Sequence, residues 1–464
     1  MTARGKPRLR ASTLHRARAE VLPDYDRSGA PCITHLGFGA FARAHLAVYF
    51  DALLRQGRPA LIRGVSIRNR WAQDHLEPQN GLFTVAVREP GEETSLQVIG
   101  ALASVETGPA AALDAMTSPA TKLVTLTITE KGYEPPLDPP GPSEVPASVP
   151  ALIAVALDRC RRDEVVPPVF APLDNLLHNG DVLRARVVEA AARTDSHLAA
   201  WIASDVRFPN SVVDRMVPAP TERDIEDIAG RVGLLDLAAV STERHRSWIM
   251  QSVDGLAALG EVGVRLVDDV TPYERRKLWL LNGPHSAVAY GGLLVGHDTI
   301  AGAVVDPTIA RFVRRIVDET LEVAEFPGAL EPTAFADAAL RRFANPALGH
   351  RCAQVGADGS SKLPQRLLPV VAARRERALP TTRFAVVVAI WIAATAGVAV
   401  SGAKLPQLED PIATALQPAA RGDSLHGLSH LALGAHTDVA FTDEVTSVLR
   451  RLTIEGPALL EVER

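Results

Sequence analysis

Three side chains that could transfer a proton and polarise a carbonyl lie close together at Lys277, Asn282 and His285. On an α-helix they fall within about 140° of arc and so share one broad face. A lysine in such an apolar context is expected to have a lowered pKa, as general acid–base catalysis near neutrality requires. An asparagine polarises a carbonyl without competing for protons. The alternative is structural, with a snorkelling lysine and with the asparagine and histidine satisfied in a cap or core.

A glycine turn follows the first expected strand, Ile33–Leu36, in the run Gly37-Phe38-Gly39-Ala40-Phe41. Two glycines at a strand-to-helix turn let the backbone approach a pyrophosphate at the positive end of the helix. The second strand ends near Arg68-Asn69-Arg70, where enzymes that prefer NAD usually place an acid. Asn69 between two arginines could instead accept the 2′-phosphate of NADP. The alternatives are an ordinary glycine turn and solvated arginines.

Polar loops follow other expected strands, at the usual ligand position of an open α/β sheet. The run Asp174–Gly180 follows the strand that ends at Phe170, and Phe208–Arg215 is a second such loop. Thr129–Tyr133 closes the strand that ends at Ile128. Asn179 or Gly180 could instead only cap the following helix, and a carboxylate at a strand end could equally form an ion pair.

The elements that must position these residues change character along the chain. Apolar runs without strict alternation, separated by helical patterns, indicate parallel strands covered on both faces and hence a doubly wound α/β domain. From about Tyr273 onward the apolar spacing is helical. We therefore expect an N-terminal extension over 1–30, a dinucleotide-binding domain over 31–267 and a mostly α-helical domain over 268–464. The expected strands are Ile33–Leu36, Leu61–Ile67, Phe83–Val87, Leu123–Ile128 and Val165–Phe170, and the expected helices are Phe41–Leu54, Ala151–Arg161, Val182–Ala192, Lys277–Leu294, Ile309–Val323, Ala334–Phe343 and Val445–Arg451.

Composition excludes several classes of protein. The 464 residues are 47% hydrophobic and carry a net charge of −5, which indicates a globular protein without the basic surface that nucleic acids require. The three isolated cysteines form neither a disulfide framework nor a metal-binding pair and favour a reducing compartment, so we expect a cytoplasmic protein. Lysine is rare, with 6 against 43 arginines. A guanidinium cannot cycle a proton, which draws attention to Lys277.

Two segments bear on targeting. The basic stretch Met1–Ala19 lacks the apolar segment of a secretory signal; the alternatives are a short transit-like extension and a frayed one, and we expect the frayed one. The run Phe384–Val400 is uncharged and close to the shortest membrane span. Because it is isolated in an otherwise polar chain, we expect a helix buried in the second domain rather than a membrane anchor.

Taken together, these stretches resemble the long-chain polyol dehydrogenase family, which includes mannitol 2-dehydrogenase and fructuronate reductase. The resemblance implies a Rossmann-type first domain, a helical second domain and metal-independent hydride transfer between NAD or NADP and a ketose or keto-acid. The substrate pair would be D-mannonate and D-fructuronate, or D-mannitol and D-fructose. The strings that carry the resemblance are GFGAFARAH (37–45), QNGLFTV (79–85), TITEKGY (127–133), DNLLHNG (174–180), FPNSVVDR (208–215), KLWLLNGPHS (277–286) and DGSSKLPQ (358–365).

Site residues are carried over position by position. The resemblance implies that Lys277 is the acid/base, that Asn175 and Asn282 polarise the reacting oxygen, and that His285 orients the substrate. It further implies a proton-path role for Glu130, substrate contacts by Asp214 and Lys362, and cofactor contacts by Gly37, Gly39, Phe41, Arg68 and Asn69.

Four departures from the family pattern limit the resemblance. Ala42 replaces a common histidine, Asn69 replaces an acid, and Pro284 replaces a serine and tends to kink a helix. Gln354 stands where mannitol-type members have arginine, which favours the uronate type; Arg351 could still meet a substrate carboxylate. A nucleotide-binding sensor or an inactive homologue is the competing hypothesis, and the sequence leaves the oligomeric state open.

Overall fold

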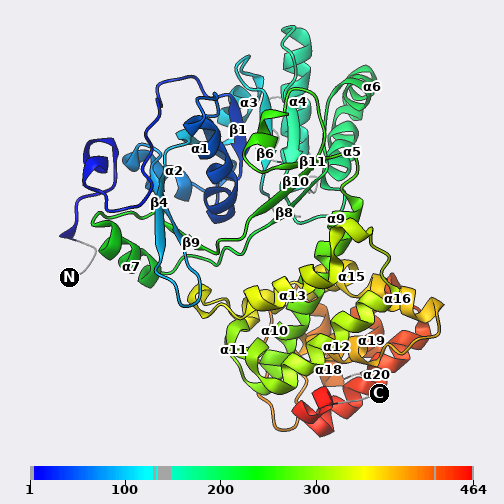
Figure 1. Ribbon diagram of the computed structural model, residues 1–464. Coiled ribbons are helices and arrows are strands. Elements are labelled where there is room, and N and C mark those ends of the chain that lie inside the picture. Colours follow the sequence, from blue (N-terminus) through cyan, green and yellow to red (C-terminus); the bar gives the residue numbers. More distant parts are fainter. Residues whose placement is uncertain (1–4, 129–131, 134–147, 423–424, 462–464) are drawn as a thin grey trace. The chain divides into compact units, whose positions relative to one another are not determined.

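The computed structural model describes residues 5–128, 132–133, 148–422 and 425–461, and the chain forms two compact units, Met1–Thr271 and Pro272–Arg464 (Figure 1). The first unit is built on sheets and the second on helices, as the sequence predicts.

The first unit is organised around a parallel sheet of five strands. Their order is β5 (Leu102–Thr107), β2 (Ile62–Ser66), β1 (Ile33–Leu36), β6 (Leu123–Leu126) and β7 (Val169–Pro172). The strand order reverses at β1, so the loops after β1 and β6 leave the sheet at its topological switch point, where α/β proteins bind ligands. The doubly wound fold is therefore confirmed. The strand expected over Val165–Phe170 instead begins at Val169 and ends at Pro172.

Both faces of this sheet are buried, which explains why its strands lack polar alternation. Ile33 belongs to one hydrophobic core and Leu36 to another, on opposite faces of the same strand. The helices that supply the first core include α1 (Ala47–Arg55) and α8 (Ala258–Glu261), and those that supply the second include α3 (Pro109–Thr117), α4 (Val149–Arg162), α5 (Asn179–Ala192) and α6 (Ser196–Asp205). The unit also contains η2 (Ala11–Arg16), α2 (Trp71–Leu76), η4 (Glu77–Gln79) and α7 (Glu222–Val232).

The unit has two smaller sheets, and the strand Phe83–Val87 lies in one of them and not in the parallel sheet, where the sequence places it. This segment, β3, pairs antiparallel with β4 (Ser95–Ile99) and parallel with β9 (Val240–Thr242), outside the five-stranded sheet. Phe83 and Ala86 enter different hydrophobic cores, so both faces of β3 are buried. Its sequence is therefore apolar without alternation, as that of a central parallel strand would be. The other sheet contains β11 (Arg265–Val267), β10 (Ser247–Gln251) and β8 (Ser211–Asp214).

The N-terminal segment is packed, so the expectation of a frayed extension over Met1–Ala19 is wrong for the described residues 5–19. Leu9 is fully buried in a core that it shares with Leu82 and Val98. The Arg27 guanidinium donates hydrogen bonds to the Gly100 and Leu102 carbonyl oxygens at 2.7 and 2.9 Å. Arg27 thus binds backbone carbonyls, whereas Arg10, Arg16 and Arg18 are exposed.

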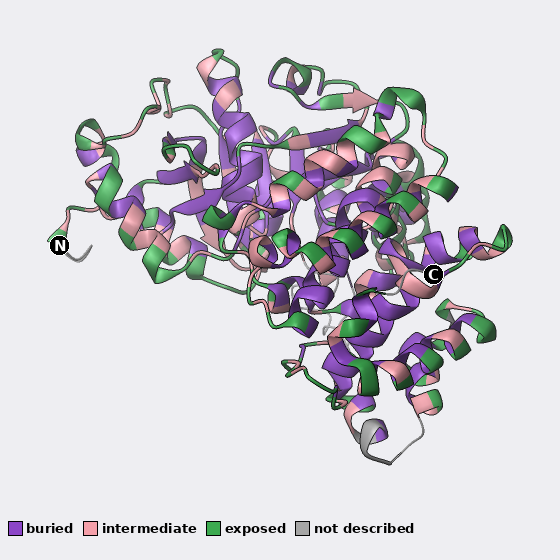
Figure 2. Ribbon diagram, turned by 60° about the horizontal axis from the view of Figure 1, so that its bottom comes forward, coloured by how far each residue is buried: buried purple, intermediate pink, exposed green. Residues whose placement is uncertain are grey.

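The second unit consists of helices, many of them begun by proline or ended by glycine. The helix α17 (Thr382–Ala396) is buried along Phe384–Ala396 and packs against α10, α18 and α20, which confirms the predicted internal helix. Among the described residues, no helix is both long and apolar enough to cross a membrane. Figure 2 shows buried residues on the inner sides of the helices and exposed ones on the outer sides. The other helices are α9 (Thr271–Lys277), η6 (Leu278–Asn282), α10 (Gly283–Val295), α11 (Ile300–Val305), α12 (Pro307–Val323), η7 (Gly328–Leu330), α13 (Pro332–Phe343), η8 (Pro346–Leu348), α14 (Cys352–Gly356), α15 (Gly359–Arg366), α16 (Leu368–Glu376), α18 (Ala413–Gly422), α19 (Leu425–Leu433), η9 (Gly434–His436), α20 (Val439–Glu455) and η10 (Gly456–Glu461).

Candidate functional site

The glycine turn after β1 is built for close approach of a ligand. Gly37 has φ +92°, and a Cβ there would lie 2.2 Å from the Thr127 carbonyl oxygen, so this position requires glycine. At Gly39 the nearest protein atom to a Cβ would be 3.7 Å away. The protein itself therefore leaves space beside Gly39, at the start of a helix that leads into η3 (Ala42–Leu46) and α1. This arrangement fits the pyrophosphate of a dinucleotide.

A buried histidine, His35, supports this turn through hydrogen bonds. The His35 ring bonds through Nδ1 to Thr125 Oγ1 at 2.8 Å and through Nε2 to Thr127 Oγ1 at 2.9 Å. Thr127 Oγ1 donates to the Gly37 carbonyl at 2.8 Å, so it accepts its other hydrogen bond from His35 Nε2–H. Burial lowers the pKa of His35 to about 3, which keeps the ring neutral. Sequence reasoning missed this support, whose only signal was a histidine within the first strand.

Arg43 is a second residue that sequence reasoning missed. It lies in the π-helical turn η3, it is 1% exposed, and its guanidinium stacks on Trp71 at 4.6 Å. Its Nε and Nη1 have no hydrogen-bond partner among the described residues, and burial lowers its pKa to about 10. In the same helical segment the half-buried Phe41 stacks on His45, with 4.8 Å between the ring centroids. Residues 41–45 thus place two aromatic rings and a guanidinium directly after the glycine turn.

The residues after β2 are exposed, and one of them has a structural role. Asn69 Oδ1 accepts a hydrogen bond from the Trp71 backbone N–H at 2.7 Å, which supports the start of α2. Arg70 lies 3.4 Å from Asp74 in an exposed ion pair. Arg68 is exposed in the loop that follows β2 at the carboxyl edge of the parallel sheet, and β2 pairs with β1, the strand that precedes the glycine turn.

The loop after β7 presents Asn175 and buries Asp174. Asn175 is exposed. Asp174 accepts hydrogen bonds from the Ile128 backbone N–H, at 2.6 Å, and from the Tyr133 hydroxyl. Burial raises the pKa of the Asp174 carboxyl to about 7, although both hydrogen bonds lower it. Asp174 therefore joins the loops after β6 and β7 beside a proposed site residue.

Asn179 and Gly180 hold this loop in place. The Asn179 side chain donates to the carbonyls of Pro172, Asp174 and Ser211 at 3.2, 3.0 and 2.9 Å and accepts from the Ser211 N–H at 2.9 Å. It is structural, as the alternative interpretation proposed, but it lies inside α5 and does not cap it. A Cβ on Gly180 would lie 2.4 Å from the Phe208 carbonyl oxygen, so the close approach of these two loops requires glycine.

Asp214 ends β8 as a buried carboxylate. Its Oδ2 lies 3.2 Å from His245 Nε2. The neighbouring Arg215 is also buried, donates to the Glu243 carbonyl through Nε and Nη2 at 3.1 and 2.9 Å, and bonds the Ala44 carbonyl. This arginine ties the end of β8 to the helix that follows the glycine turn.

The segment Lys277–His285 contains a π-helical turn, η6, that the predicted continuous helix lacks. The Gly283 N–H donates to the Leu278 carbonyl, five residues earlier. Pro284, which has no N–H to donate, follows this π turn directly. A π turn brings residues five apart closer to one line than an α turn does, so Lys277 and Asn282 lie nearer the same face than predicted.

His285 is buried among positive charges. Its ring stacks on Phe343 at 4.4 Å and meets His350 edge-on at 5.2 Å, while Nε2 lacks a hydrogen-bond partner among the described residues. Burial lowers the pKa of His285 far below its usual range, and His350, Arg366, Arg342 and Lys362 lower it further. Lys277 is half-buried, and Asn282 is buried. Pro284 lies in the first turn of α10, where a missing N–H costs little.

The remaining predicted substrate residues lie on the next helices. Lys362 Nζ donates to the Ala357 carbonyl at 2.6 Å and lies 3.9 Å from Asp358 Oδ2. The protein itself therefore already accepts at least one of the hydrogen bonds that this ammonium can donate. Arg351 is exposed at the start of α14, and Gln354 is exposed on the same helix. Glu130 lies outside the described residues.

Each unit thus brings part of the predicted site together. In the first unit, Gly37, Gly39, Phe41, Arg68, Asn69 and Asn175 follow strands of the same parallel sheet at its carboxyl edge. In the second unit, Lys277, Asn282 and His285 follow one another through η6 into α10, and the charge of Lys362 acts on His285.

Comparison with known proteins gives concordant matches along the chain. The family model of the mannitol dehydrogenase Rossmann domain matches residues 31–259, and that of the mannitol dehydrogenase C-terminal domain matches residues 269–448. D-mannonate oxidoreductase of Escherichia coli is 34% identical over 94% of this chain and 96% of its own length. Mannitol 2-dehydrogenase of Aspergillus clavatus is 30% identical, with 94% and 93% covered.

Solved structures give the same result. A ternary complex of Pseudomonas fluorescens mannitol 2-dehydrogenase with NAD and D-mannitol superimposes with a TM-score of 0.88 at 30% identity, covering 98% of this chain and 99% of the other. A D-sorbitol dehydrogenase shares the fold with a TM-score of 0.84 at 24% identity. With both family models matched in order and relatives alike over almost their whole length, the chain belongs to the mannitol dehydrogenase family of oxidoreductases.

Proposed function

We propose that this enzyme interconverts an aldonate and its keto form with NAD or NADP, and that it favours the pair D-mannonate and D-fructuronate over D-mannitol and D-fructose. The observation that carries this choice is the positive charge around His285, to which Arg366, Arg342 and Lys362 contribute. A substrate carboxylate gains from such surroundings, whereas a neutral polyol does not. The similarity to D-mannonate oxidoreductase agrees with this choice.

The proposed chemistry divides between hydride and proton transfer. The nicotinamide supplies or takes up the hydride when it is bound. Lys277 Nζ gives a proton to the substrate oxygen during ketone reduction and removes it during oxidation. The amide groups of Asn282 and Asn175 donate hydrogen bonds to that oxygen, and His285, neutral because of its lowered pKa, orients the substrate. Glu130 would carry the proton onward, and Asp214, Lys362 and Arg351 would contact the substrate.

The cofactor would bind at the turn after β1. Gly37, Gly39 and Phe41 would hold the pyrophosphate side, with Arg68 and Asn69 facing the ribose that distinguishes the two cofactors. We propose the domain bounds 31–267 and 268–464 for the cofactor and catalytic domains, with 1–30 as an N-terminal extension.

A substrate-by-cofactor matrix tests the proposal. Initial rates are measured with NADH or NADPH and either D-fructuronate or D-fructose, and in reverse with D-mannonate or D-mannitol. We expect kcat/KM to be at least about tenfold higher for the acid pair, since one charge-assisted hydrogen bond contributes roughly 1.5–3 kcal/mol. Cofactor binding without turnover of any substrate would favour the sensor hypothesis instead.

Two substitutions sharpen this test. Arg351→Met should lower kcat/KM for D-fructuronate by about tenfold or more and leave D-fructose nearly unchanged, while Arg315→Met, at an exposed position on α12, should change neither. Equal losses on both substrates would contradict a carboxylate contact. Lys277→Ala and Lys277→Arg should both lower kcat by about 10²–10⁴ without weakening cofactor binding, because neither side chain can cycle a proton near neutrality. An active Lys277→Arg variant would refute the proton-transfer role.

A further inference from the structure

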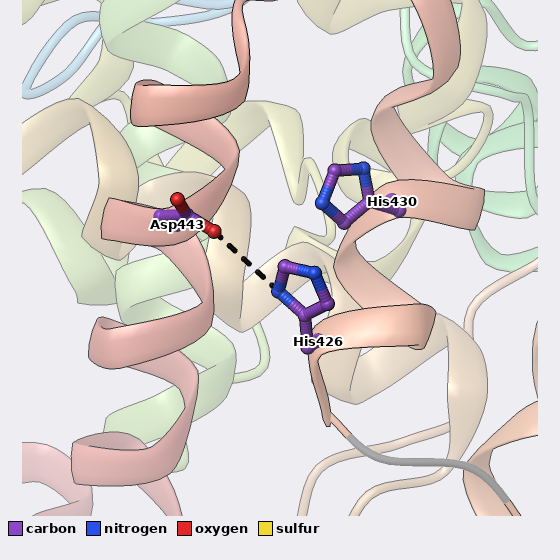
Figure 3. A group of neighbouring side chains, drawn as sticks. All are labelled: His426, His430 and Asp443. Carbon is purple, nitrogen blue, oxygen red and sulfur yellow. Dashed lines mark ion pairs between the residues drawn. The ribbon is translucent and has the colours of Figure 1, made fainter.

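Two histidines and an aspartate converge at the surface of the second unit, on helices that carry none of the proposed catalytic residues. His426 and His430 are four residues apart on α19 and so lie on one face of that helix, and Asp443 lies on the adjoining helix α20 (Figure 3). One ligand atom of each residue lies within 4.8 Å of the others. Figure 3 shows both imidazoles directed toward the carboxylate.

We propose that His426, His430 and Asp443 form a binding site for one divalent transition-metal ion, with Zn²⁺ as the best fit. Imidazole nitrogen and carboxylate oxygen are ligands that zinc prefers, and three protein ligands with water in the fourth position complete a tetrahedron.

The distances fit such a site. A tetrahedron with metal–ligand bonds of roughly 2.0–2.1 Å places its ligand atoms about 3.4 Å apart. His426 Nδ1 and Asp443 Oδ1 already lie 3.4 Å apart. The two imidazole rings are 4.3 Å apart between centroids and inclined at 66°. The ligand atoms all lie within 4.8 Å of one another, so each remaining distance must shorten by at most about 1.4 Å to reach this geometry.

Access and charge also favour a metal ion. The side chains of His426 and Asp443 are 49% and 57% exposed, so an ion can enter directly from solvent. Mg²⁺ and Ca²⁺ prefer sites made of oxygen ligands alone, and the two imidazoles therefore discriminate against them. The bound ion would link α19 to α20 across the connection 434–438. It would slow the local opening of α19, since a ligand that binds only the closed form stabilises it.

The full-length protein, treated with a chelator and then dialysed, is titrated with ZnCl₂ by isothermal calorimetry, with MgCl₂ as a second probe. The proposal predicts one saturable Zn²⁺ site and no saturable Mg²⁺ site. His426→Ala and His430→Ala should each weaken this site by roughly 100-fold, because even outer-shell changes cost 10–100-fold in metal affinity. His197→Ala, which removes an exposed histidine from α6 in the first unit, should leave the site unchanged.

Hydrogen exchange gives an independent readout that does not depend on activity. Zn²⁺ should slow amide exchange in 425–436 of the wild type and of His197→Ala, but not of His430→Ala. Absence of saturable Zn²⁺ binding, or binding that survives both His426→Ala and His430→Ala, would overturn the proposal. Because none of these residues has a role in the proposed reaction, either outcome leaves the proposed function untouched.

Discussion

The buried carboxyl of Asp174 makes the stability of the first unit depend on pH in a direction opposite to that of an ion-paired aspartate. Burial raises the pKa of Asp174 from its ordinary 3.8 to about 7. Between these two values the folded chain keeps a proton that the unfolded chain has lost. Raising the pH through this window therefore favours unfolding by about 1.4 kcal/mol per pH unit, or about 4 kcal/mol in total.

Asp174→Asn removes this titration and retains an oxygen that can accept from the Ile128 N–H. We expect the free energy of unfolding of the variant, relative to wild type, to rise by about 3 kcal/mol between pH 5 and pH 8, because the wild type has already lost part of its advantage at pH 5. Every other group titrates in both proteins and cancels in the difference.

Urea unfolding of both proteins at pH 5, 6, 7 and 8 measures this difference. Asp163→Asn, which replaces an exposed aspartate of the same unit, serves as the matched control and should show a flat difference. A difference for Asp174→Asn that is independent of pH, or one that moves in favour of the wild type as the pH rises, would refute the reasoning.

Three further substitutions test the cofactor turn and its supports. Gly37→Ala should raise the Kd for NADH by about tenfold or more, since its Cβ would collide with the Thr127 carbonyl. Gly57 also has a positive φ but open space around it, so Gly57→Ala should leave this Kd unchanged, and fluorescence titration of NADH compares the two variants. Asn69→Asp should lower the ratio of kcat/KM for NADPH to that for NADH by about tenfold, because a carboxylate repels the 2′-phosphate; an unchanged ratio would show that Asn69 does not face the ribose. Asn179→Ala should lower the free energy of unfolding by about 3 kcal/mol through the loss of its buried hydrogen bonds, and urea unfolding that shows less than about 1 kcal/mol would contradict the role.

The sequence was sufficient where a local pattern determines the structure. The glycine turn, the strands that flank it and α17 follow from apolar runs and from glycines placed at their ends. The doubly wound first unit and the helical second unit follow from the change in apolar spacing near Tyr273.

The sequence was insufficient where burial depends on distant parts of the chain. The strand β3 has the continuous apolar sequence of a central parallel strand because two separate cores cover its faces. Nothing local marks His35 as the support of Gly37, since its partners Thr125 and Thr127 lie on β6 and directly after it. The raised pKa of Asp174 likewise comes from burial by distant parts of the chain, and it persists although the hydrogen bond from Tyr133, 41 residues away, lowers it.

The two π-helical turns, η3 and η6, have a consequence for how sequence changes act on this fold. A π turn accommodates one residue more than an α turn, so each behaves as a tolerated insertion within a helix. Removing one residue from 278–281 would restore a continuous α-helix and leave Lys277 and His285 in nearly the same relative direction, because the π turn already absorbs the extra residue. The segment between Lys277 and Asn282 should therefore tolerate the loss of one residue better than it tolerates a change of Lys277, Asn282 or His285 itself, since the helix can return to α geometry without turning the proposed acid/base away from the other site residues.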